Sequence, residues 1–369
     1  MNTNSSETTI LQPGHNCWRA EKATYASVIV DVANYYRALH NSILKAKHSV
    51  FIIGWDIDSR IELLRGDDVK PGLPITLFDL LTTKAKENPN LQIYLNDWDY
   101  TLLFFANREF MPALKWRATE CPNIHFETDN VVPFHGSHHQ KLIVVDDEVA
   151  YSGGIDIGLY RWDTREHLLD NPHRLEPAGK LDKEKFKTYV PNHDIQLCVA
   201  GPVAQSLSEL VRQRWLMATD FEAIPQRIQE STDIPSTWPE YHPPEFKDVS
   251  MGISLTFPPI GDNEPIRQIE KLYIDEIRKA EKFIYIENQY LASDKIASVL
   301  NQKLKDNKDI RILLVSSKDP EGILEESVLW TKRIRFKKII KRGGVKHRVA
   351  LTYPITTNKE KEQSVHVHA

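Results

Sequence analysis

Short apolar runs alternate with segments of helical spacing along the first 220 residues of the chain. Strands are predicted over residues 25–32, 49–55, 91–96, 123–126 and 194–199, where apolar and β-branched side chains dominate. Helices are predicted over residues 34–47, 77–86 and 203–215, where apolar side chains recur at intervals of three and four. Strands that alternate with helices predict an α/β fold with a largely parallel or mixed sheet.

Two later segments have unusual compositions. Eight of the 21 prolines fall between residues 225 and 265, which predicts a linker or surface loop without regular structure. Residues 332–348 carry nine Lys or Arg and no acidic side chain, and the positions of Trp330, Ile334 and Ile340 predict an amphipathic helix that stops at Gly343-Gly344. Such a helix either covers the core with a solvated outer face or contacts anionic lipid headgroups.

The chain also repeats itself weakly. Residues 45–56 resemble residues 279–290, and residues 91–95 resemble residues 310–314. The predicted strand near Ile124 likewise corresponds to one near Val349. The second copy therefore follows the first by roughly 220–235 residues, which indicates an internal duplication.

Composition narrows the class of protein. The 369 residues are 41% hydrophobic and 27% charged, which is ordinary for one doubled domain or two domains. The net charge of −4 does not point to a nucleic-acid partner. Three cysteines without a CxxC pair argue against a disulfide scaffold or a zinc site and suit a reducing compartment. Neither a signal pattern nor an apolar run of 18 residues is present, so we expect any membrane contact to be peripheral.

The candidate chemistry lies in His139-x-Lys141-x4-Asp146, which is followed by Gly153-Gly154. If this motif lies on the strand predicted at residues 142–145, His139 and Lys141 project to the same side. One imidazole and one ammonium aimed at a common point suit a phosphate, whereas Asp146 has the opposite parity and is expected to support the site from behind. The two glycines allow backbone to approach whatever the His and Lys bind. The simpler alternative is a strand with an exposed lysine and a hydrogen-bonded histidine.

The flanking residues favour the first interpretation. Residues 135–164 resemble the first catalytic motif of the phospholipase D superfamily, HxKxxxxD, and the GGID and RWDT segments at 153–156 and 161–164 resemble its eukaryotic-type branch and bacterial relatives. Residues 192–215 and the ENQY segment at 287–290 extend the resemblance. The resemblance implies an α/β, duplicated phospholipase D-like fold, with two mixed sheets flanked by helices around a pseudo-twofold axis.

The second copy of the motif is incomplete. Adding the repeat period to His139 leads to residues 364–369, where His368 fits the second histidine and His366 competes with it. The lysine and aspartate of that copy would lie beyond Ala369, so we expect a longer natural chain and little activity from these residues alone. The predicted organisation is a flexible N-terminus at 1–20, a first half at 21–222, a Pro-rich linker at 223–265, and a second half at 266–369 that is truncated within its motif.

The resemblance implies roles for individual residues. His139 is the nucleophile that forms a phosphohistidine and His368 is the general acid, although the reverse assignment stays open. Lys141 neutralises the phosphate oxygens. No carboxylate or His/Cys cluster in the sequence suggests a metal site, so we expect catalysis without a metal or cofactor. Asp163 or Glu166 is a candidate carboxylate partner for one of the histidines, and His193 is expected to be structural. The expected substrate-binding residues are Gly153, Gly154, Asp156 and Asn288.

The substrate class follows from the same resemblance. The segments of the phospholipase branch, two motif copies in one chain and a mildly acidic composition favour a phospholipid over nucleic acid. The alternatives are a nuclease-like or cardiolipin-synthase-like enzyme of the superfamily, or a catalytically inactive membrane-associated module. We expect a monomer that is cytoplasmic or peripheral on the inner face of the membrane.

Overall fold

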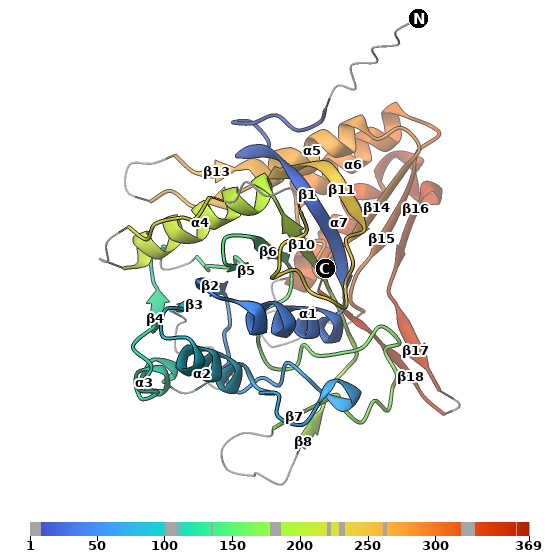
Figure 1. Ribbon diagram of the computed structural model, residues 1–369. Coiled ribbons are helices and arrows are strands. Elements are labelled where there is room, and N and C mark those ends of the chain that lie inside the picture. Colours follow the sequence, from blue (N-terminus) through green and yellow to red (C-terminus); the bar gives the residue numbers. More distant parts are fainter. Residues whose placement is uncertain are drawn as a thin grey trace, which may run out of the picture. The chain divides into compact units, whose positions relative to one another are not determined.

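The computed structural model divides into two compact units (Figure 1). It describes residues 9–99, 109, 111–133, 136–177, 186–219, 223–228, 233–260, 264–318, 329–358 and 360–368. The larger unit comprises Lys22–Val249 and Ile355–Ala369, and the smaller comprises Met1–Glu21 and Ser250–Pro354. The last residues of the chain therefore belong to the same unit as the first histidine motif.

The larger unit is built on a mixed sheet with the strand order β11-β1-β10-β6-β5-β2-β3-β4. The strands β2, β3 and β4 run parallel, whereas β5, β6, β10 and β1 follow one another in antiparallel pairs. The strand bounds are β1 Arg19–Val30, β2 Ser49–Gly54, β3 Gln92–Trp98, β4 Ile124–Asp129, β5 Leu142–Val145, β6 Val149–Gly153, β10 Ile195–Ala200 and β11 Phe246–Ile253. The expectation of an α/β fold with a mixed sheet is confirmed.

Helices cover both faces of this sheet. Its helices are α1 Val32–Lys45, α2 Leu77–Glu87, α3 Pro112–Arg117 and α4 Pro202–Ala218. Val50 and Ile52 of β2 join the core that contains α1 and α2, whereas the Arg212 guanidinium of α4 lies 4.6 Å from the ring centre of Phe51 on the opposite face. Every residue of β2 is consequently buried, which explains the uninterrupted apolar run in its sequence.

A short strand pair attaches the end of the chain to the larger unit. The strand β19, His366–Val367, pairs in parallel with β9, Asn192–His193. The backbone N–H of His366 donates to the carbonyl of Pro191, and that of His368 donates to the carbonyl of His193. The other short pairs are β7 Leu175–Pro177 with β8 Phe186–Thr188, and β17 Ile355–Thr357 with β18 Glu362–Ser364.

The smaller unit is a parallel three-stranded sheet with the order β14-β15-β16. Its elements are β12 Thr256–Phe257, β13 Ile266–Arg267, α5 Gln268–Lys279, β14 Phe283–Glu287, α6 Asp294–Asp306, β15 Arg311–Val315, α7 Trp330–Ile340 and β16 Val349–Thr352. The three repeats seen in the sequence correspond to β2, β3 and β4 in one unit and to β14, β15 and β16 in the other, in the same parallel order. A pseudo-twofold relation between the two halves stays a prediction.

Two expectations from the sequence differ from the structure. The Pro-rich segment is not free of regular structure, because β11 and β12 lie in its proline-free part between Pro244 and Pro258. In α7, Trp330 and Ile334 are 39% and 40% exposed, and the buried face is formed by Arg333, Phe336, Ile339 and Ile340. The predicted apolar face was therefore wrong by part of a turn, although the backbone does leave the helix before Gly343, which has φ 77°.

Of the predicted flexible residues 1–20, residues 1–8 lie outside the described part, and β1 already begins at Arg19. Among the described helices, none combines the length and apolarity that crossing a bilayer requires.

Candidate active site

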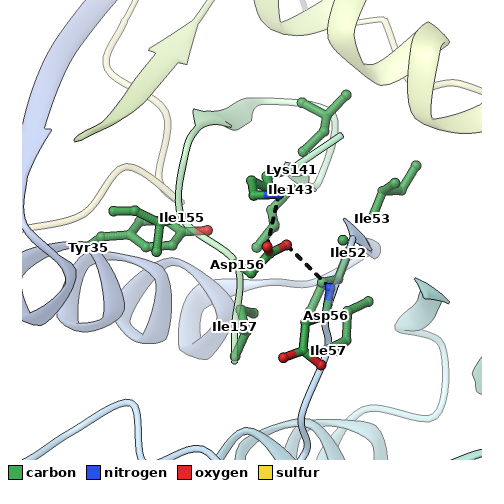
Figure 2. Close-up of a pocket in the computed structure, with 12 residues that line it drawn as sticks. Tyr35, Ile52, Ile53, Asp56, Ile57, Lys141, Ile143, Ile155, Asp156 and Ile157 are labelled. Atoms are coloured by element: carbon green, nitrogen blue, oxygen red, sulfur yellow. Dashed lines mark hydrogen bonds and ion pairs between the residues drawn. The ribbon is translucent and has the colours of Figure 1, made fainter. Parts of the chain in front are cut away.

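Lys141 lies directly before β5 and is held by a buried ion pair. Its Nζ is 2.8 Å from Oδ2 of Asp156, and both side chains are almost completely buried. Oδ1 of Asp156 accepts a hydrogen bond from the backbone N–H of Trp55 at 3.0 Å. Figure 2 shows this pair in the wall of a small pocket lined mainly by isoleucines, with the dashed contacts joining Lys141 to Asp156 and Asp156 to Asp56. The ion pair thus fixes the ammonium where β2, β5 and the turn after β6 meet.

The electrostatics of this pair favour the charged form of the carboxylate. Burial raises the pKa of Asp156, but the charges of Lys141 and Arg161 outweigh it and leave the pKa below its ordinary value. Burial also lowers the pKa of Lys141, against the opposing effect of Asp156. The lowered pKa of Asp156 favours the charged pair, whereas the lowered pKa of Lys141 favours the neutral amine. We regard the pair as charged because the backbone N–H donated to Asp156 stabilises the carboxylate as well.

His139 stands at the exposed rim of the site, two residues before Lys141. Its ring lies 5.9 Å from that of Trp55 and 6.4 Å from that of His368, measured between ring centres. Surrounding protein, and then the charge of Lys141, lower the pKa of His139 to about 3. At neutral pH the direction of this shift favours the unprotonated imidazole.

His368 reaches the site through the pairing of β19 with β9. Its Nδ1 lies 2.7 Å from Oδ2 of Asp194, a carboxylate that is itself 1% exposed. A carboxylate on one imidazole nitrogen fixes the tautomer and orientation of the ring and leaves the other nitrogen for chemistry. An imidazole nitrogen that takes part in proton transfer lies about 2.6–3.2 Å from the atom it contacts. A phosphoryl group lodged between the rings of His139 and His368 would therefore contact both.

Gly154 makes room for this carboxylate, and Gly153 makes room for the start of β10. A Cβ on Gly154 would collide with Oδ1 of Asp194, and one on Gly153 would collide with the Ile195 carbonyl and the Gln196 side chain. The backbone N–H of Gly154 donates to the carbonyl of Ile195 at 3.1 Å. The close approach that the glycines permit in the structure is thus with β10, whereas the sequence reasoning placed a substrate there.

Asp146 supports the sheet instead of the site. Its carboxylate accepts backbone hydrogen bonds from Lys47, His48 and Ser49 at 2.8, 2.7 and 2.9 Å, so it ties the turn after β5 to the start of β2. The partner of Lys141 is Asp156, not the third residue of the motif. Asp146 lies in the turn after β5 with a φ of 54°, so its orientation comes from this turn and not from the strand parity that the sequence suggested.

Replacing Asp146 by Asn removes one of these acceptors and leaves the other. Because Asn also tolerates the φ of 54° at this position, we expect a loss of about 1.5–3 kcal/mol in the free energy of unfolding. We expect the turnover of folded protein to change less than threefold. Denaturant unfolding and steady-state kinetics measure the two effects. A hundredfold loss of turnover at unchanged stability would assign Asp146 to the chemistry after all.

The remaining predicted residues are distributed more widely. Asn288 lies in the smaller unit, where its side-chain oxygen accepts from the backbone N–H groups of Tyr290 and Leu291 in a local turn. Asp163 pairs with His167 and Arg174, and Glu166 is exposed, so the carboxylate partner of a candidate catalytic histidine is Asp194 and neither of these two. His366 is buried, its ring 6.2 Å from that of His368, and burial lowers its pKa to about 3.

His138, beside the motif, provides a test of stability against pH. Burial, and then the charge of Arg214, lower its pKa from 6.5 to about 4, and its side chain is 3% exposed. The unfolded chain therefore binds more protons than the native chain between pH 6.5 and 4, so stability is lost as the pH falls through this window. Between pH 7 and pH 5 we expect His138 to contribute a loss of about 2 kcal/mol. In the His138→Asn variant the drop measured by denaturant unfolding should be smaller by that amount, and an equal drop in both proteins would contradict the assignment.

Sequence reasoning missed three residues near the site. Asp194 directly follows β9, and only the long-range β9–β19 pair brings it to His368. Arg161, within the RWDT segment, lies near enough for its charge to act on His139, Lys141 and Asp156. Trp55 ends the buried run of β2, where an aromatic side chain looked like core. A polar or aromatic residue at the end of a buried strand was the available signal for Asp194 and Trp55.

The mixed α/β sheet and the histidine–lysine motif directly before its interior strand β5 define a protein of the HxKxxxxD class. The family model for phospholipase D matches residues 42–242, more than half of the chain. The chain belongs to the phospholipase D family.

Individual relatives agree with this membership. The chain is 29% identical to phospholipase D alpha 1 of Ricinus communis over 322 residues, which covers 70% of this chain and 40% of the relative. It is 30% identical to phospholipase D B of Dictyostelium discoideum over 207 residues, which covers 50% of this chain and 17% of the relative. The chain thus spans less than half the length of these curated relatives. Among solved structures, phosphatidylserine synthase of Haemophilus influenzae shares the fold with a TM-score of 0.51 at 12% identity, covering 94% of this chain and 76% of that one.

Proposed function

We propose that the protein is a phosphodiesterase of the phospholipase D type, which hydrolyses or transfers the phosphatidyl group of phospholipids through a covalent phosphohistidine. The observation that carries the proposal is the pair of rings of His139 and His368, 6.4 Å apart, beside the ammonium of Lys141. Similarity to curated phospholipases D supports the phospholipid over a nucleotide diester.

In the first step, a ring nitrogen of His139 attacks phosphorus. The new P–N bond forms as the bond from phosphorus to the headgroup oxygen breaks, and protonated His368 gives its proton to that oxygen. The lowered pKa of His139 supports its role as the nucleophile, because an unprotonated imidazole has the lone pair that attack requires. Asp194 compensates the charge of a protonated His368 and holds its ring in place.

In the second step, His368 removes a proton from water or from an acceptor alcohol. The resulting oxygen nucleophile attacks phosphorus, the P–N bond breaks, and His139 returns to its neutral form. Lys141 and Arg161 supply positive charge near the phosphoryl oxygens in both steps, where preorganised charge is most effective. The ion pair with Asp156 keeps the Lys141 ammonium in position between turnovers.

We also propose peripheral contact of the protein with a membrane surface. On α7, the exposed Trp330 and Ile334 lie among cationic side chains that include Lys337, Lys338 and Lys341. Apolar and cationic groups on one helix suit anionic lipid headgroups. Neutralising the three lysines should weaken binding to vesicles of anionic phospholipid, and unchanged binding would leave α7 as a solvated cover of the core.

The function is tested by supplying the natural protein with phosphatidylcholine vesicles and a primary alcohol. We expect a phosphatidyl alcohol to form alongside phosphatidic acid, because the second step accepts either nucleophile. Turnover of a nucleotide diester alone would replace the proposal with a nuclease-like function. Inactivity on both substrates would indicate a non-catalytic member of the family.

A further inference from the structure

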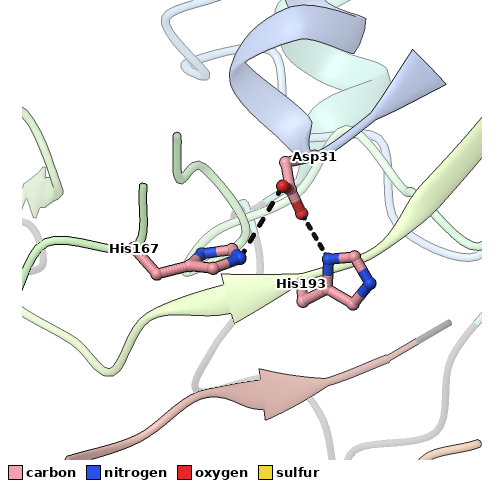
Figure 3. Close-up of side chains that lie close together, drawn as sticks. All are labelled: Asp31, His167 and His193. Atoms are coloured by element: carbon pink, nitrogen blue, oxygen red, sulfur yellow. Dashed lines mark hydrogen bonds and ion pairs between the residues drawn. The ribbon is translucent and has the colours of Figure 1, made fainter. Parts of the chain in front are cut away.

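A second cluster of polar side chains lies in the larger unit, away from the Lys141–Asp156 pair. Asp31, His167 and His193 each present one potential ligand atom, and these atoms lie within 4.8 Å of one another. Figure 3 shows both imidazoles directed at the Asp31 carboxylate from separate segments of the chain. Nε2 of His167 is 3.7 Å from Oδ2 of Asp31, and Nδ1 of His193 is 2.8 Å from Oδ1.

The Asp31 carboxylate has one oxygen that ordinary hydrogen bonding does not explain. Asp31 is 1% exposed, and its Oδ2 has no hydrogen-bond partner among the described residues. A buried carboxylate oxygen without a partner is costly, because it has lost its hydration and gained no hydrogen bond in return. Asp31 also precedes α1 as its N-cap residue, yet its side chain does not cap the helix, and its φ is 68°. The carboxylate is thus held toward the imidazoles at the expense of the capping role that aspartate usually takes.

The imidazole of His167 is oriented by a second carboxylate. Its Nδ1 lies 2.9 Å from Oδ2 of Asp163, which is fully buried and paired with Arg174 at 3.0 Å. A carboxylate on Nδ1 directs the lone pair of Nε2 outward, here toward Asp31. Histidines that bind metals almost always have such a partner on the other nitrogen.

We propose that Asp31, His167 and His193 form a binding site for a divalent transition-metal ion, with Zn²⁺ the best match. Two imidazoles and one carboxylate are a ligand set that suits such ions, and Zn²⁺ binds them at about 2.0–2.2 Å. At those bond lengths, neighbouring ligand atoms in a tetrahedral site are about 3.4 Å apart. The 3.7 Å between His167 and Asp31 is already close to that value, so small side-chain movements complete the site.

The ion would join three segments that support the candidate active site. Asp31 begins α1, His167 belongs to the segment after the RWDT residues, and His193 ends β9. Asp194, the next residue, holds His368 at 2.7 Å, and its backbone carbonyl accepts from the N–H of Asp31. The ion therefore has a structural role, because it stabilises the segments that position Asp194 and, through Asp194, the ring of His368. The expectation of a chain without metal ligands arose because no sequence spacing links residues 31, 167 and 193.

Metal binding is measured without reference to turnover, so that it is judged independently of the proposed function. Untagged natural protein is treated with a chelator, and Zn²⁺ affinity is then determined by competition with a chromophoric chelator. We expect one Zn²⁺ per chain with a Kd of about 1 μM or tighter, and at least a hundredfold weaker binding in Asp31→Asn and His167→Gln. The matched control is His48→Gln, which removes an exposed histidine elsewhere in the unit and should bind as tightly as wild type.

A second measurement guards against variants that fail to fold. His167→Cys retains a metal ligand and should recover Zn²⁺ binding, and its Co²⁺ form should show a thiolate-to-metal absorption band that wild type lacks. In wild type, Zn²⁺ should raise the melting temperature by several degrees. Less than one equivalent bound by wild type, or equal affinity in Asp31→Asn, would overturn the proposal and leave these residues as an ion-pair network.

Discussion

Replacing His139 by Asn lowers kcat by about 10⁴-fold or more and leaves substrate binding nearly unchanged. The reason is that the side chain of Asn offers no nitrogen lone pair to form the P–N bond, whereas the Lys141–Asp156 pair that attracts the phosphate stays intact. Steady-state turnover of phosphatidylcholine, with vesicle binding measured in parallel, separates the two effects.

The exposed histidine at position 48 is the matched control for this variant. His48→Gln should keep wild-type turnover, because its side chain lies outside the site while its backbone N–H still donates to Asp146. Retention of more than a tenth of wild-type turnover in His139→Asn would remove His139 from the role of nucleophile.

The second large effect is expected at Asp194, which acts through His368. Asp194→Asn should lower turnover of ordinary phospholipids by about 10²–10⁴-fold, the range in which general acid catalysis contributes. An amide in place of the carboxylate neither compensates the charge of the protonated imidazole nor holds the ring of His368 with its Nδ1–H directed at residue 194. The loss should nearly disappear from the first-turnover burst of p-nitrophenol released from a p-nitrophenyl phosphodiester, since that leaving group departs without a proton. Steady-state turnover should stay low on this substrate too, because His368 also acts as the base in the second step.

The dependence on the leaving group distinguishes positioning from simple damage to the fold. His368→Asn should reproduce the same pattern, because both variants remove the same proton donor. Equal losses in the first-turnover rate on both substrates in the two variants would mean that Asp194 maintains the structure around the site and that His368 donates no proton to the leaving oxygen.

The local motif was predictable because its chemistry is contiguous in sequence. His139 and Lys141 are two residues apart and precede an apolar strand, so their placement at the start of β5 follows from the sequence pattern. The strands β2, β3 and β4 and their counterparts in the smaller unit were visible as repeated apolar runs, although their order in the sheet was not predicted. Register and burial along these strands leave little freedom, since a slip by one residue would expose the core face.

What could not be predicted depends on contacts across long stretches of chain. The pairing of Asp156 with Lys141 instead of Asp146, and of Asp194 with His368, depends on turn geometry after β6 and on the short β9–β19 ladder. The proline-rich segment was predicted to lack regular structure from the proline content of residues 225–265 as a whole. The strand β11 needs only a short proline-free part of that segment. The apolar face of α7 was predicted wrongly because Arg333 is buried, and composition alone does not reveal a buried arginine. The Arg333 guanidinium lies 5.6 Å from the ring centre of Trp330.

The central claim, that two imidazoles meet at one phosphorus atom and one of them bonds to it, is tested most directly by trapping the intermediate. Natural protein is mixed with phospholipid labelled in the phosphate, quenched within milliseconds at alkaline pH, where phosphohistidine survives, and digested into peptides. The account predicts label on the peptide that contains His139, and its absence in the His139→Asn variant. Label on His368, or turnover of the substrate without any labelled peptide, would contradict it.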